Sequence, residues 1–272
     1  MKFADLHLHT LFSDGTYTPE ELVKESKKAG LSTIAVVDHD TIDGIMPTLE
    51  AAKKENIEVI PGIELTAEYD GLEVHILGYF IDYKNQRLKE KLDFLGNNRR
   101  ERIYKIIDKL AAIGIGLDPQ VVFEISSEGT VGRLHIARAL VKVGIVKSTA
   151  EAFQKYIGDT CPAYVCGFRF SPLEAIKLIK EMGGVAVLAH PYLLKGDELI
   201  SEFIGYGIEG LEVYYPEHTQ SMINFYLGLA KKYNLLVTGG SDCHGKAKPE
   251  VKLGMIKLPY ELVEKLKEAR KK

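Results

Sequence analysis

The residues with the clearest chemical potential lie near the N-terminus, where His7 and His9 are separated by one leucine. In an extended segment alternate side chains share a face, so both imidazoles would point to one side and Leu6 and Leu8 to the other. Two imidazoles about 7 Å apart along a strand, at ~3.4 Å per residue, can reach one metal ion at ~2.1 Å. A pair of hydrogen-bonded core histidines is the alternative. The pattern predicts the first part of a metal site.

More histidines and carboxylates follow apolar runs that are predicted to be strands. These residues are His39, Glu64, His190, Asp242 and His244. The carboxyl ends of parallel strands open onto one face of an α/β fold, which is where such folds bind ligands. Clusters of His, Asp and Glu hold divalent metals, and this density indicates more than one ion.

The elements that must position these residues alternate between helix and strand at both ends of the chain. Strands are expected at residues 2–10, 33–37, 58–63, 72–80, 185–189, 208–214 and 235–238. Thr18-Pro19-Glu20-Glu21 and Ser171-Pro172-Leu173-Glu174 are predicted helix starts with capping boxes. Tyr69-Asp70-Gly71 indicates a hairpin turn. The order β-α-β-α-β at the start of the chain implies a parallel sheet or barrel.

The middle of the chain contains no convincing strand. Helices are expected over residues 85–113, with a break near Gly96, from Asp118 onward, and over 133–143 and 149–157. We therefore expect residues 1–83 and 171–272 to form the α/β domain and residues 84–170 a helical insertion that covers it.

The composition is that of an ordinary globular protein of 272 residues, long enough for one large domain with an insertion. A net charge of −3 argues against an extended nucleic-acid surface but allows a nucleotide-sized ligand. Three cysteines make no disulfide framework. No apolar run approaches the ~20 residues that span a bilayer, and the N-terminus lacks a signal pattern. We expect a cytoplasmic protein with no membrane partner, whose oligomeric state the sequence leaves open.

The motifs together resemble the PHP (polymerase and histidinol phosphatase) superfamily of metal-dependent phosphoesterases. The matching residues are Asp5-Leu6-His7-Leu8-His9, Ser13-Asp14-Gly15, Val37-Asp38-His39-Asp40, Pro61-Gly62-Ile63-Glu64, His75, Ala189-His190-Pro191 and Gly240-Ser241-Asp242-Cys243-His244. The resemblance implies a distorted (β/α)7 barrel that carries three metal ions at its C-terminal face.

Carried over position by position, the resemblance implies three sets of metal ligands. One ion would take His7, His9, Glu64 and Asp242; a second would share Glu64 and take His75 and His190; the third would take Asp14, His39 and His244. Asp14 stands where some relatives have histidine. Mixed imidazole and carboxylate sites accept Mn²⁺, Zn²⁺ or Fe²⁺.

The insertion and the stretch Gly132–Arg138 are similar to family members that act on nucleotide phosphates. Some of these remove the 3′-phosphate of nucleoside 3′,5′-bisphosphates, and others trim short RNA from the 5′ end. We expect a metal-dependent phosphatase that hydrolyses a phosphomonoester of a small nucleotide-like substrate, such as a nucleoside monophosphate or 3′,5′-bisphosphate, with a metal-activated water. The rival interpretations are a 5′-3′ exonuclease on short RNA, a histidinol-phosphate phosphatase, a metal-dependent amidohydrolase and a non-catalytic metal-binding accessory module.

Four residues outside the ligand sets are candidates for contact with the substrate: Arg133, His135, Arg169 and His218. The guanidinium fork of Arg133 matches phosphate oxygens and could neutralise the charge that develops during hydrolysis. His218 is the candidate acid that protonates the leaving group, with a helix-capping role as the alternative. For His135 the alternative is an exposed polar helix face.

Further polar residues have open roles. Asp38 and Asp40 are expected to orient His39 or the loop after the strand. Glu212 either supports a ligand or contacts the substrate. Arg99, Arg100 and Arg102 are expected on a solvated helix face, and Tyr164, Phe168 and Phe170 in the core or against a base.

Overall fold

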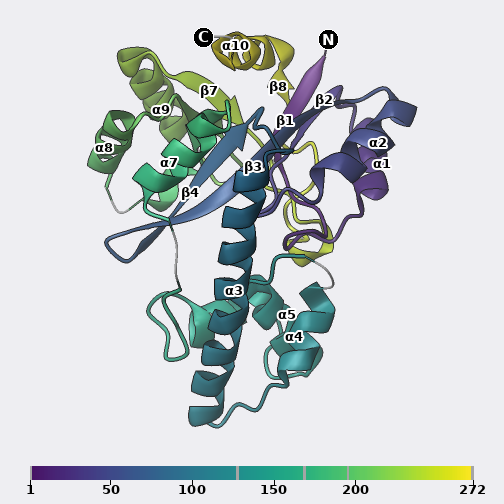
Figure 1. Ribbon diagram of the computed structural model, residues 1–272, viewed down its shortest axis with the longest axis vertical. Helices are drawn as coiled ribbons and strands as arrows, with labels where there is room; N and C mark the ends of the chain where they lie inside the picture. The colour runs from purple at the N-terminus through teal and green to yellow at the C-terminus, as the bar shows by residue number, and fades with distance from the viewer. Residues whose placement is uncertain (1, 127–128, 168–169, 195, 271–272) are drawn as a thin grey trace.

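The computed structural model describes residues 2–126, 129–167, 170–194 and 196–270. One sheet has the strand order β7-β6-β5-β4-β3-β2-β1-β8 (Figure 1). Its strands are β1 (Phe3–Leu8), β2 (Thr33–Val36), β3 (Glu58–Tyr69), β4 (Leu72–Tyr79), β5 (Val185–Leu188), β6 (Gly210–Tyr214), β7 (Leu236–Gly239) and β8 (Leu258–Pro259). The seven expected strands are thus confirmed, and β8 is a short addition.

The sheet curls until its two ends almost meet. Just after β7, the backbone N–H of Asp242 donates to the carbonyl of His7 on β1 across 2.9 Å. Gly240 lies so near β1 that an added Cβ would come 2.3 Å from the Cβ of His7, so only glycine permits this approach. The α/β barrel-like class is confirmed, and its near-closure brings the first and last motifs of the chain together.

The sheet is mixed, whereas the β-α-β-α-β order implied a parallel one. β3 pairs antiparallel with β4, β4 pairs antiparallel with β5, and β8 pairs antiparallel with β1. The expected hairpin is confirmed at Asp70 and Gly71, whose φ values of 48° and 77° suit a tight turn of the I′ kind. Because this hairpin continues β3 to Tyr69, Glu64 lies within a strand and not at its end.

Helices surround the sheet and extend below it (Figure 1). They are α1 (Pro19–Lys28), α2 (Ile45–Glu55), α3 (Gln86–Ala112), α4 (Pro119–Ser126), α5 (Arg133–Lys142), α6 (Thr149–Ala152), α7 (Pro172–Glu181), α8 (Glu198–Tyr206), α9 (Gln220–Tyr233) and α10 (Tyr260–Arg270). The capping boxes of Thr18 with Glu21 and of Ser171 with Glu174 are both present. A π-helical turn, Phe153–Ile157, continues α6, and short 3₁₀ turns follow at Pro191–Leu193 and Gly245–Ala247.

Helix α3 joins the barrel to a helical lobe formed with α4 and α5 (Figure 1). Leu88, Leu92 and Leu95 on its first half belong to the barrel's hydrophobic core, and Ile103 to Leu110 on its second half pack with the lobe. The expected break at Gly96 is wrong, because buried side chains on both sides hold one continuous helix against the ~1 kcal/mol cost of an internal glycine. In the described ranges, no helix combines the length and apolarity needed to cross a membrane.

Candidate metal centre

Glu64 is the hub of a buried cluster of imidazoles and carboxylates. Its Oε2 atom lies 3.1 Å from Nε2 of His7 and 3.2 Å from Nε2 of His9. Its Oε1 atom lies 2.8 Å from Nδ1 of His75 and 3.2 Å from Nε2 of His190. One carboxylate, only 1% exposed, therefore meets ligand candidates from three other strands or their ends.

The cluster contains three groups whose ligand atoms all lie within 4.8 Å of one another. These groups are His7, His9, Glu64 and Asp242; His9, Asp14, His39 and His244; and His39, Glu64 and His75. Ligands bound ~2.1 Å from one ion lie within about 4.2 Å of each other, so each group is close to the spread that one ion needs. The nine residues expected to bind metal are brought together.

The grouping differs in detail from the expected sets. His9 joins Asp14, His39 and His244, and its ring stacks on that of His244 with centroids 4.1 Å apart. His39 is close to Glu64 as well as to Asp14, at 3.3 Å from Oε2. His190 lies 3.2 Å from the Glu64 oxygen that His75 also contacts, but the third compact group consists of His39, Glu64 and His75 and does not include His190.

The donor atoms fit metal ions. Nε2 of His9, Oδ1 of Asp14, Nδ1 of His39 and Nε2 of His244 are buried and have no hydrogen-bond partner among the described residues. A buried polar atom without a partner costs free energy, which binding a cation would recover. Neutral imidazoles and carboxylates are the donors that Mn²⁺, Fe²⁺ and Zn²⁺ accept.

The electrostatics keep the carboxylates charged. Burial alone would raise the pKa of Glu64, but His39, His7 and His75 lower it well below its usual range. In return, burial would lower the pKa of His9, but the nearby carboxylates of Asp242 and Glu64 raise it to about 9. A metal ion that binds at His9 would therefore displace a proton.

Carboxylates behind the ligands orient the imidazole rings. Oε1 of Glu212 accepts from Nδ1 of His7 at 2.9 Å, and its Oε2 accepts from the backbone N–H of His190 at 2.8 Å. Glu73 lies 3.0 Å from Nε2 of His75, on the far side of the ring from Glu64. Hydrogen bonds of this kind fix the orientation and basicity of metal-bound histidines.

Two further aspartates shape the loops beside the ligands. Asp38 accepts from the backbone N–H and hydroxyl of Thr10, at 2.7 and 2.6 Å, and from the hydroxyl of Ser13 at 2.6 Å. It therefore holds the loop that carries Asp14. Asp40 accepts from the backbone N–H of Thr66 at 2.9 Å.

The ligands after β5 and β7 sit on unusual backbone. His190 has φ 25° and Asp242 has φ 53°, which non-glycine residues rarely adopt. Such conformations cost ~1–3 kcal/mol and persist where the surrounding structure enforces them, often at functional sites.

Two cavities open onto the ligand cluster. We call the larger, of about 310 Å³, the aromatic chamber; besides ligands it is lined by Leu134, Phe153, Tyr192, Leu193, Tyr215, Glu217, Lys248, Glu250 and others. We call the smaller, of about 190 Å³, the cationic chamber; besides ligands it is lined by Thr66, Glu73, Arg99, Arg102, Gly132, Arg133, Leu134, Phe153 and Lys248. His39 and His75 line both, so a molecule bound in either would touch the metal centre.

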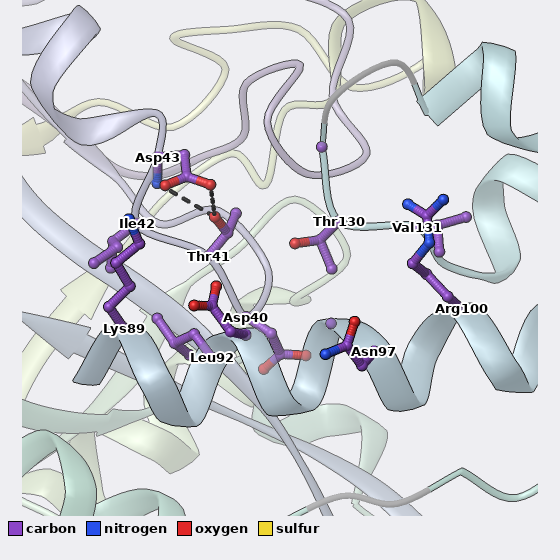
Figure 2. A pocket seen from close by; sticks show the side chains of 13 residues that line it. Asp40, Thr41, Ile42, Asp43, Lys89, Leu92, Asn97, Arg100, Thr130 and Val131 are labelled. Atoms are coloured by element: carbon purple, nitrogen blue, oxygen red, sulfur yellow. Dashed lines mark hydrogen bonds between the residues drawn. The ribbon is translucent and has the colours of Figure 1, made fainter. Parts of the chain in front are cut away.

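A third cavity, of about 440 Å³, lies outside the cluster (Figure 2). Lys89, Leu92 and Asn97 of α3 line it opposite the loop after β2, where Asp43 accepts from the hydroxyl of Thr41 at 3.1 Å. Asp40 lines this outer cavity, and Arg99, its ion-pair partner, lines the cationic chamber. The Asp40–Arg99 ion pair thus contributes one residue to the lining of the outer cavity and one to the lining of the cationic chamber.

Arg133 lines the cationic chamber, as a phosphate-binding residue should, but the structure also gives it partners. Its Nη2 atom donates to Glu73 at 2.8 Å and its Nη1 atom to Asp159. Since Glu73 also contacts His75, Arg133 links the lobe to a candidate metal ligand.

His135 is buried, so the exposed helix face suggested as its alternative role is wrong. Its Nδ1 atom accepts from the backbone N–H of Gly132 at 3.0 Å and caps α5. Burial lowers its pKa to about 4. These contacts give it a structural role.

His218 lies behind the aromatic chamber. Its Nδ1 atom donates to the carbonyl of Val213 at 2.8 Å, and its ring packs on Tyr192 and Tyr215 with both centroids at 5.4 Å. His218 is not among the described residues that line either chamber, so the structure does not support a role for it as proton donor. Arg169 and Phe168 lie outside the described residues.

Of the three α3 arginines expected on a solvated face, Arg100 is exposed as expected, whereas Arg99 and Arg102 are largely buried. Arg99 is 17% exposed and pairs with Asp40, and Arg102 is buried and donates to the carbonyl of Val165 at 2.7 Å. Arg100 lines the outer cavity. The sequence pattern of a long helix does not show which segments contact its polar side; here Asp40 follows β2 and Val165 follows the π-helical turn.

Sequence reasoning missed Lys248 and Phe153. Nζ of Lys248 lies 3.0 Å from Oδ2 of Asp242. Lys248 and Phe153 each line both chambers. Lys248 follows the His244 motif by only four residues, which was an available signal. The sequence held no comparable signal for Phe153, because the position of its side chain depends on how the lobe packs on the barrel.

Comparison with known proteins agrees with this architecture. The model of the PHP domain matches residues 5–131. A Haemophilus influenzae protein named 5′-3′ exoribonuclease is 34% identical, with 88% of this chain and 89% of that protein aligned. The 3′,5′-nucleoside bisphosphate phosphatase of Chromobacterium violaceum is 31% identical, with 88% and 86% aligned. A solved Bifidobacterium adolescentis structure, assigned as a metal-dependent phosphoesterase, has a TM-score of 0.91 at 32% identity and covers 98% of this chain and 96% of its own. The chain belongs to the PHP family of metal-dependent phosphoesterases, which are hydrolases.

Proposed function

We propose that the protein hydrolyses a phosphomonoester of a small nucleotide and releases inorganic phosphate, with three divalent ions held by its three ligand groups. The observation that supports this most directly is the pair of chambers that share the ligands His39 and His75. One chamber is rich in guanidinium and ammonium groups and the other in aromatic rings. A nucleotide has both of the corresponding parts.

Divalent ions bound here would lower the pKa of water and neutralise phosphoryl oxygens. The residues of the chain would hold this arrangement in place. Glu212 and Glu73 fix the rings of His7 and His75, and the hydroxyl of Tyr215 donates to Asp242 at 2.9 Å. Lys248 lines both chambers and is close enough to the ligands to pair with a phosphate oxygen.

A 5′-3′ exoribonuclease is the second candidate, because a 34% identical relative carries that name. The same metal centre would serve both reactions. The products differ: an exoribonuclease releases mononucleotides one after another, whereas a phosphatase releases inorganic phosphate and leaves the sugar–base bond and the chain intact.

The test is a substrate panel with the full chain loaded with Mn²⁺ or Zn²⁺. The panel contains nucleoside monophosphates, nucleoside 3′,5′-bisphosphates, histidinol phosphate, short RNA and a cyclic amide. We expect phosphate release to be fastest from the nucleotides, and to be lost in Asp242→Asn but kept in Glu181→Gln, a change on the exposed end of α7. Release of mononucleotides alone from RNA would favour the second candidate, and an inert metal-loaded protein would contradict both.

A further inference from the structure

The two chambers have opposite chemistry. The cationic chamber is lined by four cationic groups and by the carboxylates of Asp14 and Glu73, and three of the cations also pair with Asp40, Asp159 or Asp242 outside its lining. The aromatic chamber has one cation, Lys248, and carries Glu217 and Glu250 in addition to carboxylates of the ligand cluster. The first chamber thus offers guanidinium and ammonium donors for phosphate oxygens, whereas the second adds the carboxylates of Glu217 and Glu250 to those of the ligand cluster.

The apolar walls of the aromatic chamber come from both parts of the protein. Tyr192 and Tyr215 belong to segments that follow strands of the barrel, whereas Phe153 belongs to the lobe. A volume of about 310 Å³ is within the ~300–1,000 Å³ typical of small-molecule pockets. An uncharged, planar group fits walls of this kind.

The barrel wall is held rigidly. The ring of Tyr192 packs on Tyr215 at 5.6 Å and meets His218 edge-on at 5.4 Å. The hydroxyl of Tyr215 is itself held by Asp242. A ring supported from behind offers its remaining face for stacking at little cost in conformational entropy.

The lobe wall contains an irregular helix. Phe153 is the first residue of the π-helical turn Phe153–Ile157, and the guanidinium of Arg133 lies 5.7 Å from its ring centroid. Turns of this type occur often at functional sites, where they change the direction of a side chain. Phe153 lines both chambers, so this turn directs its ring to the boundary between them.

We propose that the aromatic chamber is the base-binding subsite and that Tyr192 and Phe153 bind the base of the nucleotide by stacking. This proposal rests on the proposed function and adds the specificity determinants to it. Stacking on ring faces tolerates any base, and it favours purines over pyrimidines because purines offer more area. A phosphate ester without a base gains nothing from this chamber.

The experiment compares KM for a purine nucleoside monophosphate with KM for ribose 5-phosphate, using the Mn²⁺-loaded full chain. In Tyr192→Leu and in Phe153→Leu we expect KM for the nucleotide to rise about 5- to 150-fold, the range of one stacking contact. KM for ribose 5-phosphate and the bound metal should stay unchanged. Tyr192 is close in sequence to the candidate ligand His190. Phe153 lies in a different element, so Phe153→Leu tests the proposal independently of any change at His190.

Two control variants test whether a rise in KM is specific to the aromatic chamber. Tyr104→Leu removes a half-exposed ring elsewhere on α3, and Asn97→Ala changes the outer cavity of Figure 2. Neither should alter KM. A rise on Asn97→Ala without one on Tyr192→Leu and Phe153→Leu would move the base to the outer cavity and overturn the proposal. Equal wild-type KM values for the two esters, unchanged in both chamber variants, would also overturn it. Failure of the wild type to hydrolyse either ester would instead contradict the proposed function.

Discussion

Glu73 lies 3.0 Å from Nε2 of His75, so this candidate metal ligand has one ring nitrogen, Nδ1, beside Glu64 and the other beside Glu73. Glu73 in turn receives Arg133 from the lobe. The orientation of a barrel ligand thus depends on a contact made by the insertion.

Substitution of Glu73 should weaken metal binding without removing a ligand. We expect Glu73→Gln to lower the affinity for Mn²⁺ by about 10- to 100-fold, the usual effect of losing a carboxylate behind a metal-bound histidine. Isothermal titration with Mn²⁺ measures this, and excess Mn²⁺ should restore phosphatase activity. Glu181→Gln is the matched control on an exposed surface. Unchanged affinity in Glu73→Gln would show that Glu73 does not orient His75.

The number of bound ions should depend on which carboxylate is removed. Glu64 belongs to two of the three ligand groups and Asp14 to one. After loading with Mn²⁺ and desalting, elemental analysis should find up to two ions fewer in Glu64→Gln and one fewer in Asp14→Asn. Equal losses in the two variants would contradict the central position of Glu64.

The Asp40–Arg99 ion pair should matter for stability, because it is largely buried where α3 meets the barrel. The side chains are 3% and 17% exposed. Arg99→Met leaves a buried carboxylate unpaired and should cost about 3–5 kcal/mol in the free energy of unfolding. Adding Asp40→Asn should recover part of that loss, as urea denaturation of both variants can measure.

The exposed pair of Arg87 with Glu181, 3.7 Å apart, is the control for this experiment. Arg87→Met should change the free energy of unfolding by only ~0–1 kcal/mol. If Arg99→Met costs no more than Arg87→Met, the buried pair does not hold α3 to the barrel.

His135 should make stability depend on pH. Its pKa in the folded protein, about 4, is below the ordinary value of 6.5, so the unfolded chain binds the proton more tightly. Its contribution is present above pH 6.5 and is lost as the pH falls toward 4. Between pH 7.5 and 5 this amounts to about 2 kcal/mol.

The variant His135→Asn keeps an acceptor for the backbone N–H of Gly132 but does not titrate. The difference in free energy of unfolding between pH 7.5 and 5 should therefore be smaller in His135→Asn than in the wild type, by about 2 kcal/mol. Chemical denaturation at both pH values measures it. An identical pH dependence would mean that His135 is not buried in its neutral form.

The clustering of the candidate metal ligands was predictable because most of them lie in or just after short apolar runs, and near-closure of a barrel gathers such positions at one end. His7, His190 and His244 show this directly. Capping boxes at Thr18 and Ser171 were equally readable, since they depend on four consecutive residues. Glu64 was placed at a strand end because the sequence alone does not show that the Asp70–Gly71 hairpin extends β3.

The residues that line the two chambers were less predictable, because their positions depend on how the lobe packs on the barrel. Arg99 and Phe153 have ordinary helical surroundings in the sequence, and only the docking of the lobe on the barrel turns them toward the ligands. His218 was expected to protonate the leaving group, yet its described contacts include Val213, Tyr192 and Tyr215.

The most direct test of the account is phosphate release from a nucleoside 3′,5′-bisphosphate by protein treated with a chelator and then titrated with Mn²⁺. We predict no release from the chelated protein, recovery that follows the amount of metal bound, and no recovery in Glu64→Gln. Release that continues in the chelated protein, or that Glu64→Gln leaves unchanged, would contradict the assignment of this cluster as the metal centre of a phosphatase.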